Sequence, residues 1–205
     1  MIMLCSRLIV LTSLLLLTMF GCQSPPEELR DLGEVPAFAL TNQDGKPFGS
    51  KDLVGQVWVA NFLFTSCPTS CPPLAKATAA LQDLLRAEGK GKIVTISVDP
   101  MTDTPEVLTT FGRKYGADFA IWSLLTGDYD AMEKLVVEGF FQPLARKDKG
   151  LGQPAPAEAT PLDTAHSLRF VLVDQRGHMR ALYDKSPDDL KKLTAAVSWL
   201  SSRGP

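Results

Sequence analysis

Blocks of apolar and polar residues alternate along the chain and predict a series of buried strands and amphipathic helices. The runs 57–64 and 92–99 are rich in β-branched and aromatic residues, as is typical of strands buried on both faces of a sheet. Leucines at helical spacing predict a helix over 73–85, and Thr104 begins a second helix that runs to about residue 116. Strands and helices in this alternation predict an α/β fold: a mainly parallel central sheet flanked by helices.

Elements of other kinds are expected at both ends of this central unit. The dipeptide Asp44-Gly45 is a hairpin signal near the N-terminus, and a second turn signal, 174–177, separates two apolar runs late in the chain. The remaining expected elements are a hairpin at 38–48, a short strand at 119–125, a helix at 128–139, a long exposed loop at 142–164, a β-hairpin at 166–183 and a helix at 186–201.

Residues 1–22 have the pattern of a targeting segment. Arg7 precedes an apolar run of about 13 residues that ends at Phe20, which is short for a membrane span and typical of the core of a signal peptide. The run is followed by Gly21-Cys22, which resembles a bacterial lipoprotein cleavage site and would make Cys22 the lipidated first residue. The alternatives are an ordinary signal peptide and an uncleaved anchor. In each case we expect the protein to be exported, with its domain facing the periplasm or the cell exterior.

The polar, proline-containing segment 23–35 is expected to be a flexible tether, and residues 36–205 are expected to form the folded domain. The net charge of −2 includes no cluster of lysine and arginine, which argues against a nucleic-acid partner.

Only Cys67 and Cys71 of the four cysteines belong to the folded domain, because Cys5 and Cys22 lie in the leader. An exported domain can keep a disulfide, but closing so short a loop would stabilise the fold little. The pair lies where the first long strand gives way to a helix, and we expect both thiols on one face of the first helical turn. There they could close a disulfide or hold one soft metal ion, and the helix N-terminus would favour thiolate.

The residues around this pair resemble the motif of the Sco/SenC family, whose members are exported, membrane-tethered copper proteins with a thioredoxin-like fold. Similar matches follow in the family's order as far as the C-terminal region. The matching residues are Phe62-x-Phe64-Thr65-x-Cys67-Pro68-x-x-Cys71-Pro72, then Ser97-Val98-Asp99-Pro100, Asp103-Thr104-Pro105 and His166-Ser167.

The resemblance implies a role in maturing the binuclear copper centre of cytochrome c oxidase. It also implies that Cys67, Cys71 and His166 bind copper, and two thiolates with one imidazole suit Cu(I) and can hold Cu(II). The expected partners are the copper-accepting subunit of the oxidase, or another periplasmic copper or thiol protein, and a membrane reached through the N-terminus. Asp99 ends a buried strand and either tunes these ligands or caps the following turn.

Several alternatives remain open at this point. Cys67 and Cys71 could instead reduce cysteines of a partner by thiol–disulfide exchange, act as a redox or copper sensor, or form an inert disulfide. His166 could be a strand-entry residue bonded to backbone. The peroxidase pattern of peroxiredoxins is not met, because it requires proline seven positions and threonine three positions before the cysteine, where Cys67 is preceded by Ala60 and Phe64.

Overall fold

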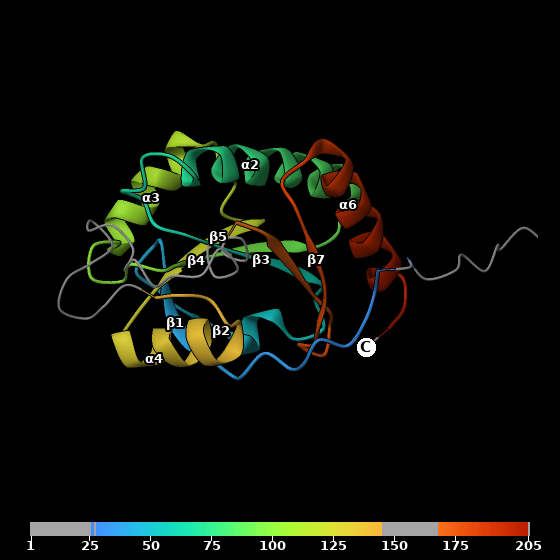
Figure 1. Ribbon diagram of the computed structural model, residues 1–205, viewed down its shortest axis with the longest axis horizontal. Helices are drawn as coiled ribbons and strands as arrows, with labels where there is room; N and C mark the ends of the chain where they lie inside the picture. The colour runs from blue at the N-terminus through green and yellow to red at the C-terminus, as the bar shows by residue number, and fades with distance from the viewer. Residues whose placement is uncertain (1–25, 27, 145–167, 205) are drawn as a thin grey trace, which may run out of the picture.

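The computed structural model describes residue 26, residues 28–144 and residues 168–204 of the chain. A seven-stranded sheet forms its centre, in the order β2-β1-β5-β4-β3-β6-β7 (Figure 1). The inner strands β5, β4 and β3 are parallel, and the other neighbours pair antiparallel. The strands are β1 (Ala39–Asn42), β2 (Pro47–Gly49), β3 (Trp58–Leu63), β4 (Lys92–Ser97), β5 (Trp122–Thr126), β6 (Phe170–Val173) and β7 (Met179–Tyr183).

Helices cover both faces of the sheet and divide the core into two layers (Figure 1). Apolar residues of α2, α3 and α6 pack on one face, whereas those of η1, α4 and η2 pack on the other. The helices are η1 (Ser50–Leu53), α2 (Cys71–Glu88), α3 (Pro105–Lys114), α4 (Tyr129–Glu133), η2 (Lys134–Gly139) and α6 (Pro187–Ser201).

The central strand β3 shows why these residues form a sheet with two covered faces. All six of its residues are buried, and their side chains alternate between the two cores. Val59 and Leu63 face the core under α2, whereas Trp58 and Phe62 face the other core, where both contact the Phe140 ring. The sequence expectation of a strand buried on both faces is therefore confirmed.

A chain of buried hydrogen bonds fastens α2 to the sheet. Asn61 Nδ2 on β3 donates to Thr78 Oγ1 on α2 at 2.9 Å, and the Thr78 hydroxyl donates to the Leu74 carbonyl at 2.8 Å. The Thr95 hydroxyl on β4 donates to Asn61 Oδ1 at 2.7 Å and accepts from Trp122 Nε1 at 2.8 Å. Because each buried polar group finds a partner, the network fixes α2 without leaving a desolvated donor.

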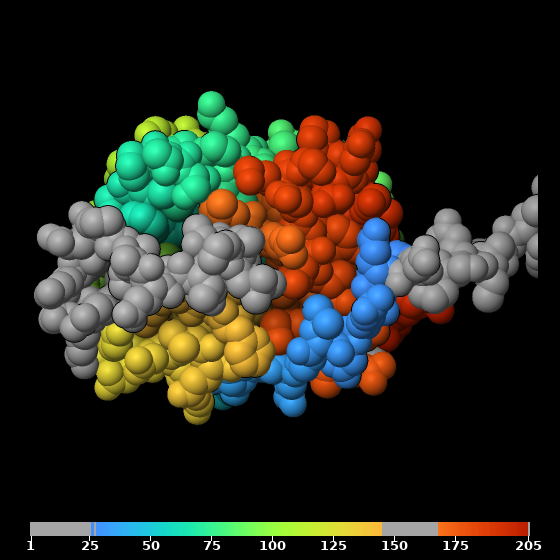
Figure 2. Space-filling view, in the orientation of Figure 1, coloured from blue at the N-terminus to red at the C-terminus, as the bar shows by residue number. Residues whose placement is uncertain are grey.

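Residues 30–33, near the beginning of the described chain, lie along the edge strand β7 (Figure 2). The amides of Arg30 and Leu32 donate to the carbonyls of Arg180 and Met179 at 2.8 and 2.9 Å, and the Met179 amide donates to the Gly33 carbonyl at 2.9 Å. These bonds cover an edge that would otherwise present unpaired backbone groups. The hydrogen-bonded residues belong to the segment 23–35 for which the sequence suggested a tether.

The expected order of elements is confirmed, with differences in detail. The short strand expected at 119–125 is β5, and the helix expected at 128–139 is a five-residue α-helix followed by a π-helix. Most of the expected loop 142–164 and the beginning of the 166–173 strand lie outside the described residues. Among the helices of the described ranges, none combines the length and the apolar character that crossing a membrane requires.

Candidate functional site

Two adjacent parallel strands end at the edge of the sheet where the cysteines lie. Leu63 at the end of β3 pairs with Ser97 at the end of β4, so the loops that follow leave the sheet side by side. The first loop carries Cys67 and leads into α2, whereas the second carries Asp99 and leads into α3. Open α/β sheets place their sites at this edge, the carboxyl ends of the strands.

Cys67 lies outside the helix that follows β3. α2 starts at Cys71, and Cys67 lies in the preceding turn, where its amide donates to the Phe64 carbonyl at 3.3 Å. The expectation that both thiols lie on one helical turn is therefore wrong. The cause is local, because Pro72 and Pro73 follow Cys71 directly and proline favours the first positions of a helix.

Cys67 and Cys71 nevertheless lie against each other. The Cys71 amide donates to Cys67 Sγ at 3.4 Å, and Ser70 Oγ lies 3.3 Å from the same sulfur. Both cysteines are free and buried, with 8% and 3% of their surface exposed. The first amides of a helix lack partners within the helix, so Cys67 sulfur here takes the place of a capping oxygen.

The two thiols differ in acidity. Burial acts to raise the pKa of Cys67, but hydrogen bonds from Ser70 and Cys71 outweigh it and lower that pKa to about 7. For Cys71 burial dominates and raises its pKa to about 12, with a further contribution from the neighbouring Cys67. At neutral pH the site therefore contains one readily formed thiolate beside one protonated thiol.

A buried carboxylate joins the two loops. Asp103 accepts from the Thr65 hydroxyl at 2.6 Å, from the Thr65 amide at 3.2 Å and from the Ser97 hydroxyl at 2.7 Å. Burial raises the pKa of Asp103 despite these bonds, and the nearby charge of Asp99 adds to the rise. Sequence reasoning noted Asp103 only as part of a motif, because its partners are 38 and 6 positions away in the chain.

Asp99 lies at the same edge and is 1% exposed. Its carbonyl accepts from the amides of Thr102 and Asp103 at 3.1 and 2.9 Å, and its own amide donates to Ser97 Oγ at 3.0 Å. The backbone of Asp99 thus organises the turn after β4. An influence of its carboxylate on the metal ligands stays a prediction.

The remaining side chains with possible ligand chemistry are those of His166, Met101 and His178, and Cys22 is the predicted lipidation site. His166 and Cys22 lie outside the described residues, so the three-ligand set stays a prediction. The parts of the chain that the structure describes hold no group of three His, Cys, Asp or Glu side chains that could bind a metal ion. Met101, in the loop after β4, has 57% of its surface exposed. His178 lies on the β6–β7 hairpin with Nδ1 3.1 Å from Asp31 Oδ1.

Most of the chain is similar to a known family and to named proteins. The SCO1/SenC family model matches residues 27–201. A SCO1 protein homolog of Bacillus subtilis is 35% identical over 82% of this chain and 84% of its own length. A protein of Stutzerimonas stutzeri that is named for copper binding is 33% identical over 72% of this chain and 69% of its own length.

The structural comparison supports the same assignment. BsSco, described as a member of the Sco family of cytochrome c oxidase assembly proteins and as having a disulfide switch, has a solved structure that is 28% identical in sequence. The likeness covers 89% of this chain and 99% of that one, with a TM-score of 0.68. The fold is thioredoxin-like, as the sequence predicted. With its cysteine pair at the carboxyl edge of the sheet and a match across nearly the whole domain, the chain belongs to the SCO1/SenC family.

Proposed function

We propose that this protein binds copper through Cys67, Cys71 and His166 and delivers it during assembly of the binuclear copper centre of cytochrome c oxidase. The observation that carries the proposal is the proximity of the two cysteines: both thiols are free, both lie at one edge of the sheet, and the Cys71 amide donates to Cys67 Sγ at 3.4 Å. The family's place in oxidase assembly, stated for BsSco, and the copper-binding name of the Stutzerimonas stutzeri relative support it.

The chemistry of the two thiols fits a copper ion that arrives and leaves. Thiolate sulfur is a soft ligand that prefers Cu(I), and imidazole also accepts copper. Because Cys71 has a pKa of about 12, it is protonated before the metal arrives and must lose its proton on binding. Copper binding should therefore release protons at neutral pH, which makes loading and unloading sensitive to pH.

The proposed role in copper delivery includes an acceptor protein and a location for the domain. The copper-accepting subunit of the oxidase is the proposed partner, and the N-terminus holds the domain at the outer face of a membrane, either through lipidated Cys22 or as an uncleaved anchor. The site then lies on the exported side of that membrane.

Copper titration of the reduced soluble domain tests this proposal. We expect about one copper per chain, and loss of tight binding when Cys67 and Cys71 are both replaced by serine, since two of three ligands are removed. The His166→Ala variant should bind copper more weakly, whereas a His178→Ala control should bind like the parent. Unchanged affinity in the Cys67→Ser, Cys71→Ser double variant would contradict the assignment.

Thiol–disulfide exchange is the second candidate, and the unequal acidity of the two cysteines favours it. A thiolate at Cys67, with a pKa of about 7, could attack a partner disulfide, and Cys71 would then complete the exchange. In that reaction Cys67 and Cys71 are oxidised to a disulfide as the partner disulfide is reduced to two thiols. The His166→Ala variant separates the two functions, because it should impair copper loading and leave the exchange rate near that of the parent.

A further inference from the structure

The Asp103 carboxylate lies between the cysteine-bearing loop and the neighbouring strand. It is fully buried, and each of its contacts comes from a donor: the Thr65 amide, the Thr65 hydroxyl and the Ser97 hydroxyl. An ionised carboxylate only accepts hydrogen bonds, so three donors around one carboxyl group match that form. Charge-assisted bonds of this kind are stronger than neutral ones, and burial strengthens them further.

The position of Thr65 gives this cluster its consequence. Thr65 is two residues before Cys67 and directly after Phe64, whose carbonyl accepts from the Cys67 amide at 3.3 Å. The Asp103 carboxylate accepts hydrogen bonds from both the amide and the hydroxyl of Thr65. It also accepts a hydrogen bond from the Ser97 hydroxyl at the end of β4. The loop that presents Cys67 is thereby fastened to a second strand at one point.

We propose that Asp103 is the positioning residue of the Cys67–Cys71 pair: through Thr65 and Ser97 it holds the loop in the conformation that keeps both sulfurs buried and in contact. The inference rests on the function proposed for this site and names a residue on which that function depends. Asp103 contacts neither sulfur in the hydrogen bonds described, so its influence passes through the loop backbone.

The two cysteines are held in place by different parts of the structure. Cys71 is fixed by α2, which the buried network of Asn61 and Thr78 holds against the sheet. Cys67 lies outside the helix, so its distance from Cys71 depends on how the preceding loop is held. If the loop moves away, the Cys71 amide loses its acceptor and Cys71 becomes accessible to solvent.

Differential thiol labelling of the reduced protein tests the inference without copper. In the parent, an alkylating reagent at one fixed pH should label buried Cys71 far more slowly than Cys67. Asp103→Asn keeps the shape of the side chain but removes its charge and one acceptor oxygen. We expect this variant to raise the rate at Cys71 relative to Cys67 by about tenfold or more, the scale on which loss of hydrogen bonds to a charged group shifts a local equilibrium.

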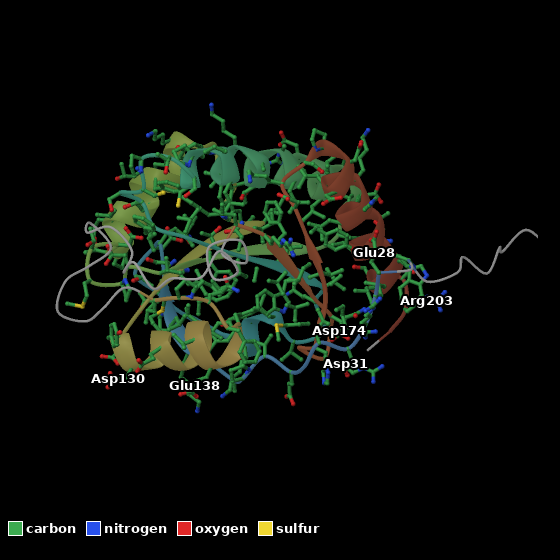
Figure 3. The ribbon with its side chains drawn as sticks, viewed as in Figure 1. Glu28, Asp31, Asp130, Glu138, Asp174 and Arg203 are labelled. Carbon is green, nitrogen blue, oxygen red and sulfur yellow. The ribbon has the colours of Figure 1, made fainter. Side chains whose placement is uncertain are left out.

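Asp174→Asn is the matched control. Asp174 is also buried, at 5% exposed, and accepts from the amides of Arg176 and His178 and from Arg180. It follows β6 beside the start of β3, at the opposite end of the sheet from Cys67, and lies at the lower right in Figure 3. We expect Asp174→Asn to lower the melting temperature and to leave the ratio of the two labelling rates unchanged.

Thr65 variants supply a second route if Asp103→Asn does not fold. Thr65→Val removes the hydroxyl that donates to Asp103, so it should raise the ratio, whereas Thr65→Ser retains a hydroxyl and should restore the parent ratio. An unchanged ratio in both Asp103→Asn and Thr65→Val would overturn the inference. These measurements contain no copper, so an unchanged labelling ratio would overturn the role of Asp103 without contradicting copper binding. Conversely, unchanged copper affinity in the Cys67→Ser, Cys71→Ser double variant would contradict copper binding without contradicting the role of Asp103.

Discussion

Cys67 and Cys71 are chemically identical side chains that the fold makes unequal. Cys67 lies in a turn, where Ser70 and the first amide of α2 donate to its sulfur, whereas Cys71 is enclosed by the helix and the core. Hydrogen bonds to sulfur stabilise the thiolate at Cys67, whereas at Cys71 burial outweighs such bonds and favours the thiol. The pair thus combines a sulfur that is ionised near neutral pH with one that stays protonated there.

The pH dependence of alkylation should show this difference directly. For the reduced domain we expect the rate at Cys67 to rise with a midpoint near pH 7, in accord with its lowered pKa, and the rate at Cys71 to stay low up to pH 9 because its pKa is about 12. Peptide mass spectrometry after timed labelling from pH 5 to 9 measures both rates.

The same shift has a consequence for stability. Since the pKa of Cys67 is lower in the folded chain, its ionisation stabilises the fold above the unfolded value of about 8.5, and this contribution is lost as the pH falls through about 7.

Ser70→Ala should move the midpoint of Cys67 alkylation to higher pH, because the Ser70 hydroxyl no longer donates to the Cys67 sulfur. A Cys67 midpoint at or above the ordinary thiol value would contradict the assignment of thiolate character to Cys67.

Sequence reasoning identified the pair but not its asymmetry. The spacing of Cys67 and Cys71, and their position after a buried strand, was enough to select them as the reactive residues. Which of them is acidic depends on Ser70 and on where α2 begins, and a turn of Pro68-Thr69-Ser70 does not reveal that. Asp103 was equally hidden, because its partners, Thr65 in the loop after β3 and Ser97 at the end of β4, meet only in the folded chain.

Helix α2 depends on its buried threonine for its place on the sheet. Thr78 accepts from Asn61 and donates to Leu74, so Thr78→Val would leave the Asn61 amide without its partner in the core. We expect the free energy of unfolding to fall by about 1–3 kcal/mol, the usual cost of an unsatisfied buried donor. Urea denaturation measures the change.

Thr194→Val is the control for this prediction. Thr194 is also buried in a helix and makes the same bond to a carbonyl four residues earlier, that of Leu190. Valine at this position removes the hydroxyl but leaves no asparagine amide without an acceptor. The free energy of unfolding should therefore fall less than it does in Thr78→Val. Equal losses in the two variants would show that the link from α2 to β3 contributes nothing of its own.

The N-terminal segment on β7 should be held by a pH-dependent ion pair. His178 lies against Asp31, and this hydrogen bond raises the pKa of His178 and lowers that of Asp31; Asp174 and Glu34 add to the rise at His178. The histidine contribution is present below about pH 6.5 and is lost as the pH rises through the raised value, whereas the aspartate contribution is lost below about pH 4.

Hydrogen exchange at the Leu32 amide, which donates to Met179, measures this docking. We expect exchange in the His178→Asn variant to exceed that of the parent at pH 5.5 and to approach it at pH 8, where both lack the charged histidine. Dividing the variant rate by the parent rate at each pH removes the intrinsic effect of pH. A ratio that does not change with pH would exclude a role for the charged pair.

Pattern and propensity predicted most strands and helices because their residues bury one face or both. The segment at 28–35 has no such pattern: it joins β7 through backbone bonds at Arg30 and Leu32, which any sequence could make. The π-helix at Lys134–Gly139 has the same apolar spacing as an ordinary helix turn, so its geometry was not predictable either. Hydrogen bonds between backbone groups are difficult to predict from the sequence, because they do not depend on which side chains are present.

Across the described domain, the cysteine edge and the first described residues of the chain lie apart. Cys67 and Cys71 follow the carboxyl end of β3, whereas the β6–β7 turn that Asp31 and His178 flank lies beside the start of that strand. Glu28 and Asp31 lie at the right of Figure 3, and α2 begins at the left of Figure 1. If the N-terminus holds the protein to a membrane, as proposed, the first residues that the structure describes, from residue 28, lie away from the cysteine edge.

This arrangement makes the mode of attachment testable separately from the site. If Cys22 is lipidated, Cys22→Ser should prevent lipidation and processing at that position, whereas Cys5→Ser, in the leader, should leave both unchanged. Mass spectrometry of the mature N-terminus checks this: we expect a lipid-modified Cys22 in the parent and in Cys5→Ser, and none in Cys22→Ser. Copper titration of the full-length parent and the Cys22→Ser variant in detergent should give the same affinity, because Cys22 is not one of the proposed ligands Cys67, Cys71 and His166. A parent protein that keeps residues 1–22 would instead identify the leader as an uncleaved anchor.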